Sequence, residues 1–217
     1  MKKSFLRFGM ILTLVASVCM SGCGIVKVVE IGQESKYTND VEFNAGDDVA
    51  AIWESSALPE LTQSAIDLKE FLEASKGDYK VLAEEHGKYS MGDTGELSYT
   101  VKGDAIVEEV NTKSQAGFME IKLKEYSGNE ILKIQIGPVY KGSSVRDSLS
   151  FIKFGDYKNQ EQWAAVSQSI NKIIAETVVK PTNPENLKGK EISFVGTFTV
   201  SAGSTEVLIT PVALEVK

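Results

Sequence analysis

The 217-residue chain has few of the residues that carry covalent or metal chemistry. It contains two cysteines, Cys19 and Cys23, and a single histidine, His86. One imidazole without a second nitrogen or thiolate ligand does not make a transition-metal site. The carboxylate pairs Asp47-Asp48 and Glu84-Glu85 lack the spacing of a calcium loop, and no glycine-rich phosphate motif occurs. The sequence therefore predicts no metal, no cofactor and no catalytic set.

Apolar runs long enough to span a membrane are also missing. The run at residues 8–20 has 13 residues, too few for a permanent membrane-spanning helix. It follows a cationic head at residues 2–7 and ends at Ser21 and Gly22, two small residues directly before Cys23. These are the parts of a secretory signal with a small-residue cleavage site. Residues 1–22 are therefore predicted to be removed on export.

The cysteine after this signal resembles the last residue of the lipobox of bacterial prolipoproteins. There the thiol is diacylglycerylated and the chain is cut just before the cysteine. The sequence thus predicts Cys23 as a lipidation site, with membrane lipid (palmitate among the acyl chains) as partner. The predicted location is extracytoplasmic and lipid-anchored, on the periplasmic face or the outer surface, and Gly24 leaves the choice of membrane open. The alternative is an ordinary signal cut near Gly22, which leaves Cys23 as a free thiol.

The mature chain keeps no cysteine for other chemistry. Cys19 leaves with the signal and the thiol of Cys23 carries lipid, which excludes disulfides, thiolate catalysis and zinc-thiolate sites. The 195 residues from 23 to 217 suffice for a core without such cross-links. Loss of the three cationic residues of the signal changes the formal charge from −7 to −10. An acidic surface repels phosphate backbones, so nucleic acid is not an expected partner.

Residues 23–43 are predicted to be a lipidated tether with a first strand, and residues 44–217 a single domain. The domain begins with a helical segment over 44–87. Asn44 and Asp47 have the spacing of a capping box, and Pro59 suits the first turn of a helix that continues to Gly77. Its apolar residues recur at helical spacing: Leu61, Ala65, Leu68 and Leu72.

The remainder alternates as β-strands. Five are expected, over residues 97–110 (with a bulge at Gly103), 117–123, 132–136, 192–198 and 207–216. A helical insertion, with capping-box spacings at Ser144 and Asn159, separates the third strand from the fourth. The prediction is an α+β, mainly β fold: a small OB-like barrel of about five strands with an N-terminal helical segment. An open meander with packed helices is the alternative.

The densest group of special residues follows the third strand: Gly137, Pro138, Tyr140, Lys141, Gly142, Arg146 and Asp147. One interpretation places this loop at the barrel mouth, where Arg146 and Asp147 hydrogen-bond sugar hydroxyls or a carboxylate and Tyr140 offers a stacking surface. The other is structural: Asp147 caps its helix, and Arg146 pairs with a carboxylate or a backbone carbonyl. Helix capping alone accounts for Asp147, so the structural interpretation is favoured. Trp53 and Trp163 are expected to pack in the core.

A family resemblance joins these features. Its residues are Cys23, the stretch Phe43-Asn44-Ala45, Trp53, Leu58-Pro59, Val101-Lys102-Gly103, Ile136-Gly137-Pro138, Lys141-Gly142, Arg146-Asp147, Phe151, Phe154 and Asn159-Gln160. The chain resembles the predicted bacterial periplasmic lipoproteins of domain of unknown function 2291. That resemblance implies an OB-like barrel carrying helices, and an accessory role beside ribose-type sugar ABC importer components. No catalytic residues are established for the family.

The leading prediction is therefore a non-enzymatic envelope lipoprotein that binds a small carbohydrate or importer components. The chain is too short for a two-lobed sugar receptor. An enzyme acting on envelope glycans or glycosides is the first alternative, and it predicts convergent acids in a deep cleft with a raised carboxyl pKa. A structural or assembly lipoprotein that contacts other envelope proteins is the second, and it predicts an exposed apolar patch without a small-molecule pocket.

Overall fold

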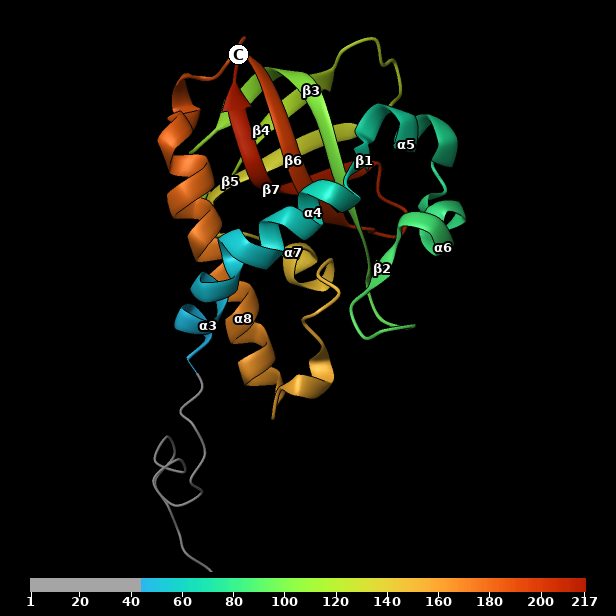
Figure 1. Cartoon of the computed structure of the whole chain (residues 1–217). Helices are drawn as coiled ribbons and strands as arrows, with labels where there is room; N and C mark the ends of the chain where they lie inside the picture. The colour runs from blue at the N-terminus through green and yellow to red at the C-terminus, as the bar shows by residue number, and fades with distance from the viewer. Residues whose placement is uncertain (1–43) are drawn as a thin grey trace, which may run out of the picture. The chain divides into compact units, whose positions relative to one another are not determined.

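A computed structural model describes residues 44–217 of the chain (Figure 1). The predicted signal, residues 1–22, and the predicted tether and first strand, residues 23–43, lie outside the described residues, and so does Cys23. Residues 44–217 form one unit. Within them, no helix has the length and apolar character needed to cross a membrane.

Five strands of this unit close into a barrel. They are β3 (Leu97–Asn111), β4 (Ala116–Leu123), β5 (Ile131–Pro138), β6 (Glu191–Thr199) and β7 (Glu206–Val216). Hydrogen bonds join them in the order β3-β4-β5-β7-β6, and β6 pairs again with β3 to complete the circle. Only β5 and β7 are parallel; the other barrel pairs are antiparallel. This closure confirms the predicted barrel and rules out the open meander.

The barrel core comes from the period-two alternation of the strands. Its side chains are at most 8% exposed: Tyr99, Val101, Ala105, Val107, Met119, Ile121, Leu123, Leu132, Ile134, Ile136, Ile192, Phe194, Phe198, Val207, Ile209 and Leu214. The alternating apolar residues of the second and third predicted strands are all among them: Met119, Ile121, Leu123, Leu132, Ile134 and Ile136. The apolar alternation therefore fixed which face of each strand is buried.

The predicted bulge at Gly103 is wrong. β3 pairs with β6 without interruption from Ser98 to Ile106, with Gly103 opposite Phe194. The register shift lies instead in the pairing of β3 with β4, between Val107 and Glu109. Glu108 is the extra residue there, and both glutamates stay exposed. A bulge that leaves two charged side chains in solvent avoids burying either of them.

The N-terminal helices differ from the prediction in one respect. The elements are α3 (Ala45–Ile52), the π-helical η1 (Trp53–Ala57), α4 (Leu58–Ser64), β1 (Ile66–Asp67), α5 (Leu68–Ser75), the 3₁₀-helical η2 (Tyr79–Leu82), α6 (Ala83–His86) and β2 (Lys88–Tyr89). The Asn44 side chain accepts the backbone N–H groups of Gly46 and Asp47, which confirms that cap. The single helix predicted from Pro59 to Gly77 is two helices, α4 and α5. The short strand β1, which pairs with β3, separates them, and the Asp67 side chain caps α5 by accepting the Glu70 N–H.

The insertion between β5 and β6 contains α7 (Ser144–Asp147), η3 (Phe154–Asp156), α8 (Gln160–Ile173), the π-helical η4 (Ile174–Val179), η5 (Lys180–Thr182) and η6 (Pro184–Asn186). Asn159 caps α8 by accepting the N–H of Gln162, as predicted. The predicted cap at Ser144 is wrong: its hydroxyl lies 2.7 Å from that of Thr197 on β6 instead. Figure 1 shows α8 below the barrel beside α3 and α7, and the helix continues along one side of the barrel as η4, which packs against β7 and β5.

An aromatic cluster fastens the N-terminal helices to the barrel. Phe71 of α5 has its ring centroid 4.7 Å from that of Tyr99 and 5.6 Å from that of Phe198. Tyr79 completes the group, and the Tyr99 hydroxyl donates to its carbonyl oxygen. Burial raises the pKa of Tyr99 to about 12, so the hydroxyl stays protonated and remains a donor. The helical segment is thus a fixed part of the domain.

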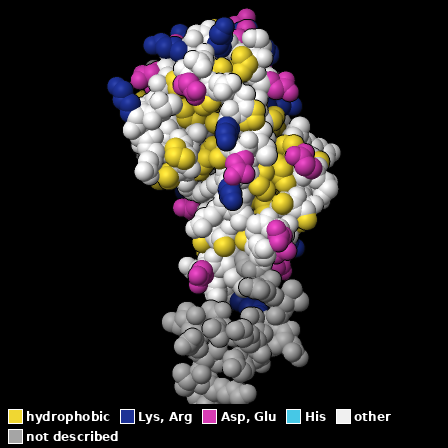
Figure 2. All heavy atoms as spheres, turned by 90° about the vertical axis from the view of Figure 1, so that its left-hand side faces the viewer, with side chains coloured by type: hydrophobic (Ala, Val, Ile, Leu, Met, Phe, Trp, Pro, Cys, Tyr) yellow, Lys and Arg dark blue, Asp and Glu magenta, His cyan; other side chains and the backbone are white. Residues whose placement is uncertain are grey.

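Figure 2 shows the face that lies on the left of Figure 1, the side of α8 and η4. Hydrophobic side chains gather there in separate groups, with lysine and acidic side chains between them. An assembly lipoprotein is expected to carry one continuous apolar patch, and this face does not present one.

Candidate functional site: the Asp147 cleft

The segment from Gly137 to Asp147 crosses the outside of the barrel as a strap. Gln135, on the face of β5 opposite Ile134 and Ile136, is its main fastening. The Gln135 amide nitrogen donates to the Lys141 carbonyl (3.0 Å) and to the Thr210 hydroxyl (2.8 Å), and its oxygen accepts the Lys141 N–H (2.7 Å). Further along, Ser144 bonds to Thr197 of β6. The N-terminal half of this strap contains four of the predicted site residues: Gly137, Pro138, Tyr140 and Lys141.

Tyr140 packs on its own loop. Gly137 has φ +72°, and a Cβ added there would lie 2.7 Å from the Tyr140 ring, so only glycine fits. The ring is half-buried, and burial raises the pKa of Tyr140 to about 12. Gly142, with φ +82°, turns the exposed chain toward α7. The Tyr140 ring therefore packs against Gly137 and stabilises the strap.

Replacing Gln135 with leucine is expected to lower the free energy of unfolding by about 1–3 kcal/mol. The leucine has a similar volume, but it leaves the Thr210 hydroxyl and both backbone groups of Lys141 without their partner. Urea denaturation of both proteins measures the loss. The control is Gln115→Leu in the exposed loop before β4, which should change stability by less than about 0.5 kcal/mol. Equal stability of the two variants would show that Gln135 does not hold the strap.

Arg146 is buried by contacts on three sides. Its Nε and Nη2 atoms donate to the same carboxylate oxygen of Asp147, Oδ1, at 2.8 Å and 2.6 Å, and its Nη1 donates to the Trp163 carbonyl at 2.9 Å. The guanidinium also lies 3.8 Å from the Trp163 ring centroid, a cation–π stack. The Arg146 side chain is 7% exposed. It pairs with a carboxylate and a carbonyl together, as the structural interpretation predicted.

Asp147 does not cap a helix, which corrects the structural interpretation for this residue. Its Oδ1 is occupied by Arg146 rather than by helix N–H groups, and its Oδ2 has no hydrogen-bond partner among residues 44–217. The side chain is 1% exposed. Burial raises the pKa of Asp147, and the Arg146 charge opposes this rise without cancelling it. Capping failed as an explanation because α7 has only four residues and Arg146 competes for the carboxylate.

A cleft of about 840 Å³ opens beside Asp147. Two segments far apart in sequence line it: residues 83–93, which hold α6 and the β2 hairpin, and residues 147–156, which run from the end of α7 through the loop that follows it. Its lining residues are Ala83, Glu84, Gly87, Lys88, Tyr89, Ser90, Met91, Gly92, Asp93, Asp147, Leu149, Ser150, Ile152, Lys153, Phe154, Gly155 and Asp156. Of the seven residues predicted for a site, only Asp147 reaches this cleft.

Trp163 connects the Arg146–Asp147 pair, the floor of the cleft, with the wall that contains Phe154. The Trp163 ring holds Arg146, which holds Asp147, and it also contacts Phe154 and Tyr157 with ring centroids 5.7 Å and 5.3 Å away. Trp163 is buried, as expected, and so is Trp53. The sequence did not indicate that Trp163 orders the site, because its contact with Arg146 spans 17 residues.

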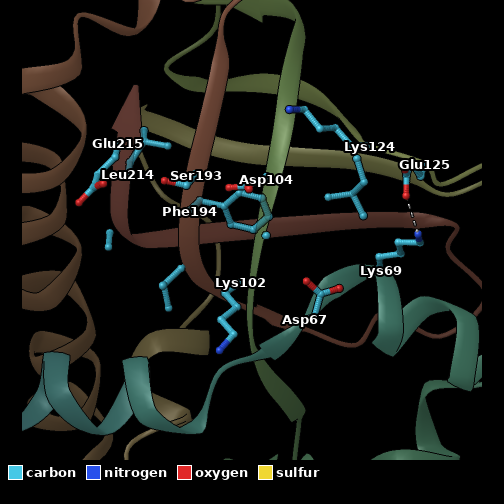
Figure 3. A pocket seen from close by; sticks show the side chains of 14 residues that line it. Asp67, Lys69, Lys102, Asp104, Lys124, Glu125, Ser193, Phe194, Leu214 and Glu215 are labelled. Carbon is cyan, nitrogen blue, oxygen red and sulfur yellow. Dashed lines mark ion pairs between the residues drawn. The ribbon is translucent and has the colours of Figure 1, made fainter. Parts of the chain in front are cut away.

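A second hollow of about 560 Å³ lies where β1 and α5 meet the barrel (Figure 3). The Lys69 amine and Glu125 carboxylate form an ion pair across it at 3.7 Å. Asp104 and Lys124 on its rim are paired with Lys217 and Glu191. No buried, unpartnered polar atom among residues 44–217 lines this hollow. The Asp147 cleft is therefore the stronger candidate site.

His86 is the last residue of α6 and lies 3.7 Å from the Glu85 carboxylate. Across residues 44–217, no three histidine, cysteine, aspartate or glutamate side chains come together as a metal site.

The closed barrel, with its helical insertion between the third and fourth strands, defines an OB-fold protein. The crystal structure of an OB-fold protein from Thermotoga maritima is similar, with a TM-score of 0.62 and 14% identity, over 82% of this chain and 100% of that one. The family model of predicted periplasmic lipoproteins, domain of unknown function 2291, matches residues 13–215, and the chain belongs to this family. This membership agrees with the predicted extracytoplasmic location. No curated protein matches the chain significantly.

Proposed function

We propose that this lipoprotein is a non-enzymatic binding module of the cell envelope. In this proposal a diacylglyceryl group on Cys23 holds it at the membrane, and it serves ABC-type import of small, ribose-like carbohydrates as an accessory component. One observation carries the binding role: Asp147 lines a cleft, and its buried Oδ2 atom has no hydrogen-bond partner among residues 44–217. An unpaired buried acceptor costs about 1–3 kcal/mol, and a ligand that supplies a donor removes this cost.

The charge balance of the Arg146–Asp147 pair, at the floor of the cleft, determines which kind of ligand group can donate to Oδ2. Asp147 is neutralised by Arg146, so the buried pair carries no net charge. A cationic ligand group would leave an uncompensated positive charge in a buried place, and an anionic group cannot donate to Oδ2. An uncharged hydroxyl group donates without either penalty. The floor of the cleft therefore favours a hydroxyl-bearing ligand.

The cleft walls suit a sugar ring. Ile152 and Phe154 present apolar surface, against which the C–H face of a ring packs, while Lys88, Ser90 and Lys153 offer donors for further hydroxyl oxygens. The volume of about 840 Å³ lies within the range of small-molecule sites. The link to import rests on the family resemblance, and the single barrel domain favours an accessory role over that of a two-lobed receptor.

A thermal-shift screen of pentoses and hexoses tests the binding role. A sugar that binds only the folded protein adds about 2.7 kcal/mol of stability at 100 times its Kd. For a domain of this size, that gain raises the midpoint by about 5–10 °C. Asp147→Asn should abolish the shift because the amide replaces the charged acceptor. Glu185→Gln, an exposed carboxylate on η6, removes the same charge and should keep the shift.

Two results count against this role. No shift with any sugar at millimolar concentration would contradict sugar binding. A shift that Asp147→Asn leaves intact would place the ligand outside the cleft. Circular dichroism of the Asp147→Asn protein confirms that it is folded before its binding is compared.

A glycoside-acting enzyme is the second candidate. The observation in its favour is the raised pKa of Asp147, in a cleft that Glu84, Asp93 and Asp156 also line. A buried carboxyl with a raised pKa suits a general acid. Against it, the Arg146 ion pair occupies one oxygen of this carboxylate. Release of 4-nitrophenol from 4-nitrophenyl glycosides, lost in Asp147→Asn, would support the enzyme and displace the binding module.

A further inference from the structure

We infer that the ligand of the Asp147 cleft is amphipathic, with a hydroxyl-bearing head at Asp147 and an apolar body that lies along the rim. The inference rests on the proposed binding function and concerns the half of the ligand that Asp147 does not contact. Three exposed hydrophobic side chains carry it: Tyr89, Met91 and Phe151.

These side chains are concentrated at one place. Eight large hydrophobic side chains among residues 44–217 are exposed, and Tyr89 (36%), Met91 (54%) and Phe151 (39%) are three of them. Tyr89 and Met91 line the cleft directly. Phe151 does not line the cleft itself, but it lies between Ser150 and Ile152, which form part of the facing wall. A polar floor thus has an apolar rim.

Backbone hydrogen bonds hold the rim of the β2 hairpin in place. Tyr89 pairs with Leu97 of β3, and the Ser90 N–H donates to the Glu96 carbonyl at 3.0 Å. The Met91 N–H donates to the Thr94 carbonyl at 3.0 Å, and the Ser90 hydroxyl accepts the Glu96 N–H. Met91 is therefore presented to solvent from a tied turn. An ordered apolar side chain at a cleft rim gains free energy when a ligand covers it.

The facing wall is also fastened. The Ser150 N–H donates to the Glu60 carboxylate of α4 at 2.8 Å, and the Phe154 ring stands edge-on to Trp163. Because both walls are tied, an apolar group that enters between them replaces water without first ordering the loops.

The charges of the cleft point to an uncharged body. Two lysines, Lys88 and Lys153, and three acids, Glu84, Asp93 and Asp156, line the cleft, so its charges nearly balance. A mixed rim of this kind does not attract a strongly charged partner of either sign. Methionine adapts its shape to flat groups and makes favourable contacts with aromatic rings. An aryl or short alkyl substituent on a hydroxyl-bearing head matches these features.

Paired glycosides test the inference. The probes are methyl and phenyl glycosides of ribose, glucose and galactose, which share a head and differ in the apolar body. For at least one sugar, the phenyl glycoside should bind the wild-type protein about tenfold more tightly than the methyl glycoside, in isothermal titration calorimetry. Met91→Ser and Phe151→Ser should reduce this ratio toward one, because they weaken the phenyl glycoside more than the methyl glycoside.

Two further variants are controls. Val216→Ser removes an equally exposed side chain (44%) on β7 and should keep the tenfold ratio. Asp147→Asn should weaken both glycosides together. Equal affinity of phenyl and methyl glycosides in the wild-type protein would overturn the amphipathic ligand and leave the binding function standing. A ratio that survives Met91→Ser and Phe151→Ser also overturns it, and binding of neither glycoside overturns both proposals.

Discussion

Replacing Arg146 with methionine is expected to lower the free energy of unfolding by about 3–5 kcal/mol at neutral pH. Methionine keeps much of the apolar stem but removes the guanidinium. The Asp147 carboxylate then stays buried without a counter-charge, and the Trp163 carbonyl loses its donor. Breaking a buried ion pair from one side is among the most costly single substitutions in a protein. Urea denaturation at pH 7 measures the loss.

The stability lost in Arg146→Met depends on pH, and the direction of this dependence follows from the pKa of the Asp147 carboxyl group. The pKa of Asp147 is raised in the folded protein, so the folded state holds this proton more tightly than the unfolded chain does. The contribution of Asp147 to stability therefore falls as pH rises from about 3.9, the unfolded value, to the folded pKa. Arg146 opposes the rise in pKa, so its removal raises the pKa further and widens this window. The stability difference between wild type and Arg146→Met should shrink as the pH is lowered.

Two controls separate the ion pair from general damage. The double variant Arg146→Met, Asp147→Leu removes both charges and should recover about half or more of the loss, since apolar residues often replace a buried ion pair without cost. Lys122→Met breaks an exposed pair with Glu108, 4.0 Å apart, and should cost less than about 1 kcal/mol. A double variant no more stable than Arg146→Met would show that the cost comes from packing instead of from the unpaired carboxylate.

The barrel was predictable because its signals are local. Alternation such as Met119, Ile121 and Leu123 on one strand assigns the buried face without knowledge of the neighbouring strand. The caps at Asn44 and Asn159 were likewise correct, because each depends on N–H groups two or three residues away. Five strands with an insertion after the third then leave few closed arrangements.

The errors arose where a distant residue competes for a local group. Ser144 has the spacing of a cap, but Thr197, 53 residues away, takes its hydroxyl. Asp147 sits in a first helical turn, but Arg146 takes its carboxylate and is itself held by Trp163. Capping propensity is weak compared with a buried ion pair, so the tertiary contact prevails in both places.

The cleft shows the same limit more clearly. Its walls come from the hairpin near Tyr89 and the loop near Phe154, which are more than 60 residues apart in the chain. Each wall alone looks like an ordinary surface segment. Only Asp147 belonged to the predicted group. What singles it out is that it lines the cleft and that its Oδ2 atom has no partner among residues 44–217, and both are properties of the folded state.

Replacing Cys23 with alanine is expected to abolish lipid attachment completely. In the proposed anchor the diacylglyceryl group is carried by the Cys23 thiol, and alanine offers no acceptor for it. Each buried CH₂ of an acyl chain contributes about 0.8 kcal/mol to membrane binding, and two chains give a stable anchor where one is marginal. In cells fed radiolabelled palmitate, the wild-type protein should carry label and the Cys23→Ala protein none.

Cys19→Ala is the matched control, because it changes a cysteine four residues away that is preceded by Val18 instead of a small residue. It should leave labelling and processing unchanged.

Intact mass adds a second readout: lipobox cleavage requires the modified cysteine, so Cys23→Ala should accumulate as the uncut chain, 22 residues longer than the mature form. An ordinary signal peptide gives the opposite pattern. The wild-type protein would then carry a free, alkylatable thiol at its N-terminus, and Cys23→Ala would be cut as efficiently as the wild type. Such a result would remove the anchor and leave the cleft on a protein free to diffuse from the membrane, so this substitution decides whether the Asp147 site works at the membrane surface.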